Sequence, residues 1–162
     1  SETIVNQLVD IMLLLTITGA GDRLQGIKKG INELANLIII TKDDGDNQEK
    51  VKETMLDYNS IMSLNIKTDA NSIPKVFKCS SHENTGIKEI NIATKQYIQR
   101  SKETNLFNIK RTTQKTYWIN KILKEELGNR KYNELKQTNR IIDIENKIIK
   151  EKKNLFDLIA NL

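Results

Sequence analysis

Two short polar segments, each directly after an apolar run, carry side chains suited to recognising a guanine base. Thr41-Lys42-Asp43-Asp44 follows Leu37 to Ile40, and Ser80-Ser81-His82 lies at the end of the run that begins at Lys75. A carboxylate offers two acceptor oxygens that match the N1–H and N2–H2 donors of guanine, and adenine lacks this donor pair. A lysine can lay its aliphatic stem along the base plane while its ammonium group stays hydrated. The two segments therefore predict a guanine site.

Three apolar runs position these segments: Ile11 to Ile17, Leu37 to Ile40, and Val76-Phe77 within Lys75 to Ser80. Runs of this length are typical of strands that are buried on both faces of a parallel sheet. Apolar residues recur at helical spacing in the two intervening segments, from Asp22 to Asn36 and from Gln48 to Ser63. This order predicts two βαβ units of an open parallel sheet. Both polar segments then lie at its carboxyl edge, where such sheets bind ligands.

The character of the sequence changes after Gly86, where apolar residues recur at helical spacing and Gly128 is expected to end a helix. We predict a partial α/β domain over residues 1–100 and a helical extension over residues 101–162. Three strands are few for an open sheet, which indicates an incomplete domain. A C-terminal apolar stripe must be buried, either within the chain or against a second copy: Ile141, Ile144, Ile148, Leu155, Leu158, Ile159 and Leu162.

A longer motif connects the guanine hypothesis with a known family. Gly19-Ala20-Gly21-Asp22-Arg23-Leu24-Gln25-Gly26-Ile27-Lys28-Lys29-Gly30-Ile31 stands in register with Thr41-Lys42-Asp43-Asp44-Gly45-Asp46. In this order the chain resembles the ArgK/MeaB-type GTPases, strongly up to Asp46 and weakly after Gly128. The resemblance implies an α/β fold, the C-terminal half of a P-loop GTPase parallel sheet. It would have about three strands with flanking helices, followed by an α-helical arm that builds a homodimer.

The resemblance assigns guanine binding to the two polar segments, at Thr41, Lys42, Asp44, Ser80, Ser81 and His82. Lys42 and Asp44 would contact the base, and Ser81, where the family usually has Ala, would donate its backbone N–H. Thr41 stands where the family usually has Asn. Asp43 replaces a family Ala, and at a solvated position its charge would weaken nucleotide binding by a few tenths to about 1 kcal/mol.

Plainer interpretations of the same residues stay open. Asp43, Asp44 and Asp46 would also suit a turn that caps the next helix. His82 is the only histidine, and a lone loop histidine is more often a solvated side chain than a catalytic base.

The loop between the first two runs is a second candidate site. Its polar and glycine residues resemble a family segment that lies near the nucleotide and relays its state to a partner: Gly21, Asp22, Gln25, Gly26 and Lys28. The alternative is that Asp22 caps a helix and Lys28 is solvated.

A GTPase also needs a phosphate-binding loop, Gly-x4-Gly-Lys-Ser/Thr, whose amides and lysine hold the phosphates and whose hydroxyl serves magnesium. None of the seven glycines precedes Lys-Ser or Lys-Thr, and Gly21 to Gly26 is followed by Ile27-Lys28. No Asp-x-x-Gly motif precedes the first apolar run. In the family both motifs lie upstream. The chain is therefore expected to begin after them, to be inactive alone in GTP hydrolysis, and to meet magnesium only with that N-terminal half.

The function implied by the resemblance is that of a GTP-binding, metallochaperone-type GTPase that assists a cobalamin-dependent acyl-CoA mutase. GTP or GDP would be its ligand, and this chain would be a fragment of the whole protein. The alternative is a non-catalytic helical interaction or dimerisation module derived from the same family.

Composition argues against several other classes of function. The net charge of +5 is spread along the chain without a run of like charges, which argues against nucleic-acid binding. No apolar run is long enough to span a bilayer. One cysteine and one histidine argue against a zinc site. With no signal peptide visible, we predict a cytoplasmic protein without nucleic-acid, membrane or metal partners.

Overall fold

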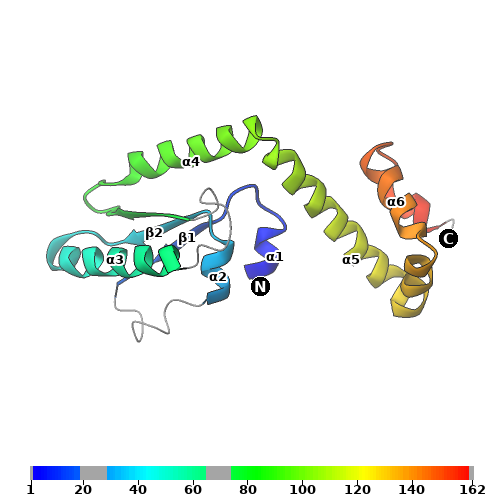
Figure 1. Cartoon of the computed structure of the whole chain (residues 1–162), viewed down its shortest axis with the longest axis horizontal. Helices are drawn as coiled ribbons and strands as arrows, with labels where there is room; N and C mark the ends of the chain where they lie inside the picture. Colours follow the sequence, from blue (N-terminus) through cyan, green and yellow to red (C-terminus); the bar gives the residue numbers. More distant parts are fainter. Residues whose placement is uncertain (1, 19–28, 65–73, 161–162) are drawn as a thin grey trace. The chain divides into compact units, whose positions relative to one another are not determined.

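The computed structural model describes residues 2–18, 29–64 and 74–160 (Figure 1). The chain divides into two compact units, Ser1–Glu103 and Thr104–Leu162. The first unit contains the strands, whereas the described part of the second unit consists of helices and their connections.

The sheet of the first unit has three parallel strands in the spatial order β1-β2-β3: β1 (Leu13–Thr16), β2 (Leu37–Thr41) and β3 (Lys75–Cys79). Ile38 of β2 pairs with Leu14 on one side and with Val76 on the other. Because all three strands run in the same direction, their carboxyl ends meet at one edge of the sheet. The predicted α/β class, with a parallel sheet of three strands, is confirmed.

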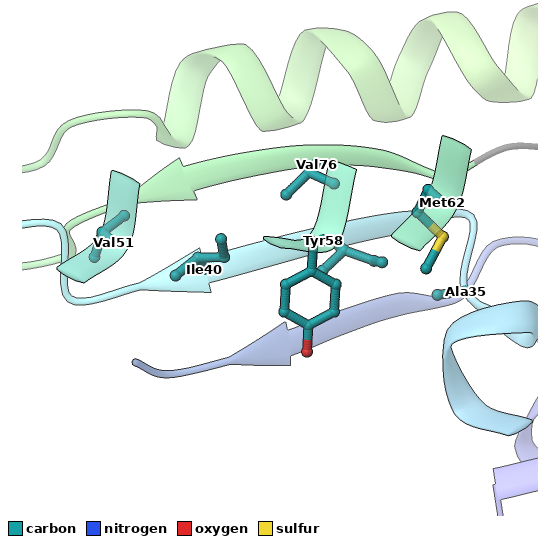
Figure 2. Close-up of a cluster of buried hydrophobic side chains, with 7 residues drawn as sticks. Ala35, Ile40, Val51, Tyr58, Met62 and Val76 are labelled. Atoms are coloured by element: carbon teal, nitrogen blue, oxygen red, sulfur yellow. The ribbon is translucent and has the colours of Figure 1, made fainter. Parts of the chain in front are cut away.

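One face of the sheet packs against α3 (Gln48–Leu64), which corresponds to the helix expected over Gln48 to Ser63. One face of this helix is buried, at Val51, Tyr58 and Met62. Figure 2 shows these side chains in one cluster with Ala35, Ile40 of β2 and Val76 of β3. Each large apolar side chain buried in this way contributes roughly 1.5–3 kcal/mol. The cluster therefore fixes α3 on the sheet.

The strands differ in burial. Ile38 and Ile40 of the central strand are 0% exposed, whereas Leu13 and Leu15 of β1 are 37% and 63% exposed. The expectation that all three runs are buried on both faces is therefore wrong for β1. Leu14 packs against the cluster under α3, and Leu13 and Leu15, which alternate with it along the strand, point to the other face of the sheet and stay exposed there.

Short helices and one long helix complete the first unit: α1 (Glu2–Asn6), α2 (Lys29–Leu34), the 3-10 turn η1 (Gly45–Asn47) and α4 (Ile87–Glu103). The helix expected from Asp22 is described only over α2, and it ends before Asn36. The side chain of Asn36 accepts a hydrogen bond from the Met12 N–H at 2.9 Å and donates one to the Tyr97 hydroxyl at 2.8 Å. These bonds tie α4 to the start of β2.

The second unit packs α5 (Leu106–Gln137), α6 (Arg140–Ile149) and α7 (Leu155–Ile159) around Ile119, Leu123 and Ile144. The helix α5 is interrupted by a kink at Gly128, the residue expected to end a helix, where φ is 72° and ψ is 165°, a conformation open mainly to glycine. The predicted apolar stripe is used inside this unit. Ile141 and Ile144 are buried, and four further members pack against the cluster: Ile148, Leu155, Leu158 and Ile159. Leu162 lies outside the described residues.

A guanine-type site at the carboxyl edge of the sheet

The two predicted polar segments lie side by side in the structure. Thr41, the last residue of β2, pairs in register with Cys79, the last residue of β3. The segments that follow these two residues therefore leave the sheet at the same edge. Thr16 ends β1 at this edge as well. This arrangement follows from the parallel pairing, because residues far apart in sequence are brought together only by the register of the strands.

Thr41 fastens the start of its loop to the neighbouring strand. Its hydroxyl donates a hydrogen bond to the carbonyl oxygen of Thr16 at 3.1 Å, and the residue is half-buried. The family usually has Asn at this position. A short polar side chain is sufficient for the contact that the structure shows between the ends of β2 and β1.

Lys42 has a backbone conformation that a lysine rarely adopts. Its φ is 63°, in the left-handed region, and its side chain is exposed. This conformation costs a non-glycine residue roughly 1–2 kcal/mol. The cost is offset in part by Asn47, whose Nδ2 donates a 2.7 Å hydrogen bond to the Lys42 carbonyl oxygen. The Oδ1 atom of Asn47 accepts a 2.7 Å hydrogen bond from the hydroxyl of Thr18.

Asn47 is a site residue that the sequence analysis missed. It lies in η1, just after the polar segment, and it connects the segment that follows β1 with the backbone of Lys42. Its residue type could have pointed to this role, because the side chain of an asparagine carries both a donor and an acceptor and can bridge two loops. Asparagine is also common in turns for local reasons, so the residue type alone does not identify a bridge between two loops.

Asp44 is held by Ser80. The Ser80 hydroxyl donates a hydrogen bond to Oδ2 of Asp44 and accepts one from the Glu83 N–H at 3.0 Å. Ser80 is fully buried and Asp44 is half-buried, so the pair fixes the carboxylate at the border of solvent. Although Asp44 occupies the N-cap position of η1, its side chain makes no capping hydrogen bond. The plainer interpretation of a turn before the next helix agrees with η1, which leads directly into α3, but the Asp44 carboxylate itself bonds Ser80 and not this turn.

Asp43 is buried, with 8% of its surface exposed, so the assumption of a solvated position is wrong. Its Oδ2 atom lies 2.8 Å from Nζ of Lys78, and its N–H donates a 3.0 Å hydrogen bond to the carbonyl oxygen of Cys79. Burial raises the pKa of the Cys79 thiol, and the negative charge of Asp43 raises this pKa further.

The loop after β3 is a tight turn that presents Ser81 and His82 to solvent. Ser80 and Thr85 close it by exchanging two backbone hydrogen bonds, of 3.1 and 3.0 Å. Gly86 follows with φ of 75°, and a Cβ atom there would lie 2.1 Å from the carbonyl oxygen of Lys78. The turn can therefore pack against β3 only with glycine at position 86.

The second candidate site, the proposed partner loop, lies outside the described residues: Gly21, Asp22, Gln25, Gly26 and Lys28. Within residues 2–18, 29–64 and 74–160, no group of three or more His, Cys, Asp or Glu side chains is placed to hold a metal ion. No helix in the described part of the chain is long and apolar enough to cross a membrane.

Comparison with known proteins identifies relatives over most of the chain. GTPase ArgK of Escherichia coli is 38% identical over 129 residues, which are 80% of this chain and 39% of that protein. The methylmalonic aciduria type A homolog, mitochondrial, of Mus musculus is 32% identical over 127 residues, or 78% of this chain and 31% of that protein. The chain thus spans less than half the length of either curated relative.

A solved structure has the same fold. The crystal structure of an LAO/AO transport system kinase superimposes with a TM-score of 0.68 and 28% sequence identity, covering 98% of this chain and 53% of the other. Residues 1–136 match the family described as Methylmalonyl Co-A mutase-associated GTPase MeaB. Because this match extends over most of the sequence, the chain belongs to the MeaB family of GTPases.

Proposed function

We propose that this chain supplies the guanine-recognition site of a GTP-binding protein. The observation that carries the proposal is the Asp44 carboxylate, held by the buried Ser80 hydroxyl at the carboxyl edge of the sheet. One hydrogen bond from Ser80 leaves acceptor capacity on this carboxylate, because an ionised carboxylate has about four lone-pair sites. That capacity matches the N1–H and N2–H2 donors of guanine.

Other residues of the two loops take supporting roles in this proposal. The exposed side chain of Lys42 lies along the base plane, and the backbone N–H of Ser81 donates to the guanine O6 atom. Thr41 holds the ends of β1 and β2 together, and Ser80 orients Asp44. His82 lies exposed in the same turn and contacts the edge of the ligand.

The activity of the whole protein is a wider proposal. The resemblance suggests a metallochaperone-type GTPase that assists a cobalamin-dependent acyl-CoA mutase, and the family name supports association with methylmalonyl-CoA mutase. GTP hydrolysis needs a phosphate-binding loop and magnesium, and the 162 residues contain no Gly-x4-Gly-Lys-Ser/Thr sequence. We propose that this chain acts as the base-reading fragment, in the cytoplasm, and that phosphate and magnesium contacts come from polypeptide beyond these residues.

Calorimetric titration with GDP, GTP and ATP tests the proposal, together with Asp44→Asn. Guanine-selective binding is expected in the original chain and is expected to be lost in Asp44→Asn. Asp46→Asn is the matched control, because Asp46 is an exposed aspartate of the same turn and its substitution should leave the affinity unchanged. Equal affinities for GDP and the adenine nucleotide, or no binding by a chain with native circular dichroism, would contradict the proposal.

A second candidate is a non-catalytic helical interaction or homodimerisation module. It is supported by large apolar side chains of the second unit that remain exposed, namely Leu106, Ile109, Ile142 and Phe156. The apolar stripe, for which packing within the chain and against a second copy were both open, is packed inside the unit, so a dimer would use exposed side chains such as these four. Sedimentation equilibrium of the chain and of Ile142→Asp tests this candidate. A monomer at all concentrations would contradict it.

A further inference from the structure

We infer that the ion pair between Asp43 and Lys78 positions the guanine-reading loop, by anchoring it to β3 through a buried charge that Lys78 neutralises. The family resemblance expects alanine at position 43, where this chain carries Asp43. The inference rests on the proposed function, because it concerns the same loop that carries Asp44.

The environment of Asp43 shows why the lysine matters. The Oδ1 atom of this carboxylate is buried and has no hydrogen-bond partner among the described residues, while Oδ2 contacts Lys78 at 2.8 Å. A buried carboxylate without a counter-charge is strongly disfavoured. The Lys78 side chain is 41% exposed, so its ammonium group keeps part of its hydration while it neutralises the carboxylate.

The connections around the pair show what it holds in place. The backbone N–H of Asp43 bonds the carbonyl oxygen of Cys79, the residue after Lys78. The next residue of the loop is Asp44, and the next residue of the chain after Cys79 is Ser80, whose hydroxyl bonds Asp44. The ion pair, the backbone bond and the Ser80 bond thus fasten consecutive residues of one loop to consecutive residues at the end of β3.

Loss of the lysine alone should therefore disturb base recognition more than loss of both partners. In Lys78→Met, the Asp43 carboxylate must turn toward water or remain buried without compensation, and either change moves the backbone next to Asp44. Its uncompensated charge also repels an anionic nucleotide. In the double variant Asp43→Ala with Lys78→Met, no charge needs neutralisation, and position 43 carries the residue of the family pattern.

The decisive experiment is a double-mutant cycle in which calorimetry measures the affinity of each variant for GMP and for IMP. IMP lacks the 2-amino group, so the ratio of the two affinities reports the placement of Asp44. Lys78→Met should lower GMP affinity by roughly three- to tenfold and reduce the preference for GMP over IMP. The double variant should recover both. The matched control is Lys75→Met, at the exposed opposite end of β3.

Amide hydrogen exchange at Asp43 separates this inference from the proposed function. Lys78→Met should accelerate exchange of this amide at least about fivefold, and the double variant should restore its protection. If the original chain binds no GMP, the proposed function fails, and exchange alone then decides whether the pair anchors the loop. Unchanged exchange would overturn the inference. So would a cycle in which Lys78→Met lowers only stability and leaves the preference for GMP over IMP intact.

Discussion

The side-chain nitrogen of Asn47 lies 2.7 Å from the carbonyl oxygen of Lys42, a residue whose backbone is in the left-handed region. The same asparagine accepts a hydrogen bond from Thr18, so one side chain connects the segment after β1 with the loop after β2. Left-handed backbone at a non-glycine residue persists only where its surroundings stabilise it, and such residues are common at binding sites. Asn47 is therefore expected to set the conformation of Lys42.

Asn47→Ala tests this relationship. The substitution removes both hydrogen bonds, each of which contributes roughly 0.5–1.5 kcal/mol, and leaves the Lys42 backbone free to relax. We expect a loss of roughly 1–2 kcal/mol in the free energy of unfolding, with a GDP affinity reduced by about three- to tenfold. Denaturant unfolding and calorimetry measure the two effects. Asn59→Ala, at an exposed position of α3, is the control, and an Asn47→Ala chain with unaltered GDP affinity would argue against the role.

The helices and strands that position the site were predictable where the apolar pattern of the sequence matches the side chains that are buried in the fold. The apolar run of β2 is buried on both faces, and the spacing of Val51, Tyr58 and Met62 in α3 matches one buried face. These features are local in sequence and are dictated by periodicity. The exposure of Leu15 in β1 was not predictable in the same way. It depends on what packs against that face of the sheet, and the sequence of β1 does not encode the elements that cover it.

The site was predicted in its residue types but not in its connections. Thr41, Lys42, Asp44 and Ser80 are brought together at one edge of the sheet, and their role in binding guanine stays a prediction. Asn47 and Lys78 were missed, because their contacts depend on parallel register and on turn geometry rather than on spacing along the chain. The burial of Asp43 was missed for the same reason, since an aspartate beside a polar loop is normally expected to be solvated.

Asp44→Asn is expected to change base preference rather than only to abolish binding. An amide at position 44 replaces one acceptor oxygen by a donor, so it no longer matches the two donors of guanine but can pair with the C2 carbonyl of xanthine. We expect the GDP affinity to fall by roughly 2–3 kcal/mol, with a gain in affinity for xanthosine diphosphate. Competition titrations with both nucleotides measure the change. A parallel loss of both affinities would indicate that the Asp44→Asn substitution disrupts the loop instead.

Gly86→Ala should destabilise the first unit strongly. The residue has φ of 75°, and an added Cβ would lie 2.1 Å from the Lys78 carbonyl oxygen, which is backbone and cannot yield easily. The expected loss is roughly 2–5 kcal/mol, from the left-handed conformation together with the steric conflict. Gly45→Ala is the matched control, because Gly45 also has a positive φ but no atom within 4 Å of the added Cβ. Far-UV circular dichroism during urea unfolding compares the two, and equal losses would exclude the steric explanation.

The Cys79 thiol should report the buried charge of Asp43 through its pH dependence. Burial and the Asp43 carboxylate both raise the pKa of this thiol, so the folded chain keeps its thiol protonated at a pH where the unfolded chain has lost the proton. The contribution of this thiol to the free energy of unfolding is therefore fully present below the unfolded pKa of about 8.5. It is lost as the pH rises through the pKa of the thiol in the folded chain. When the native chain is labelled with iodoacetamide over a range of pH, the midpoint pH of the labelling rate should lie above that of a free thiol. Asp43→Asn removes the second cause only, so the midpoint should move down while burial keeps it above the value of the unfolded chain. Asp46→Asn should leave it in place, and an Asp43→Asn chain with an unshifted midpoint would show that the carboxylate does not act on the thiol.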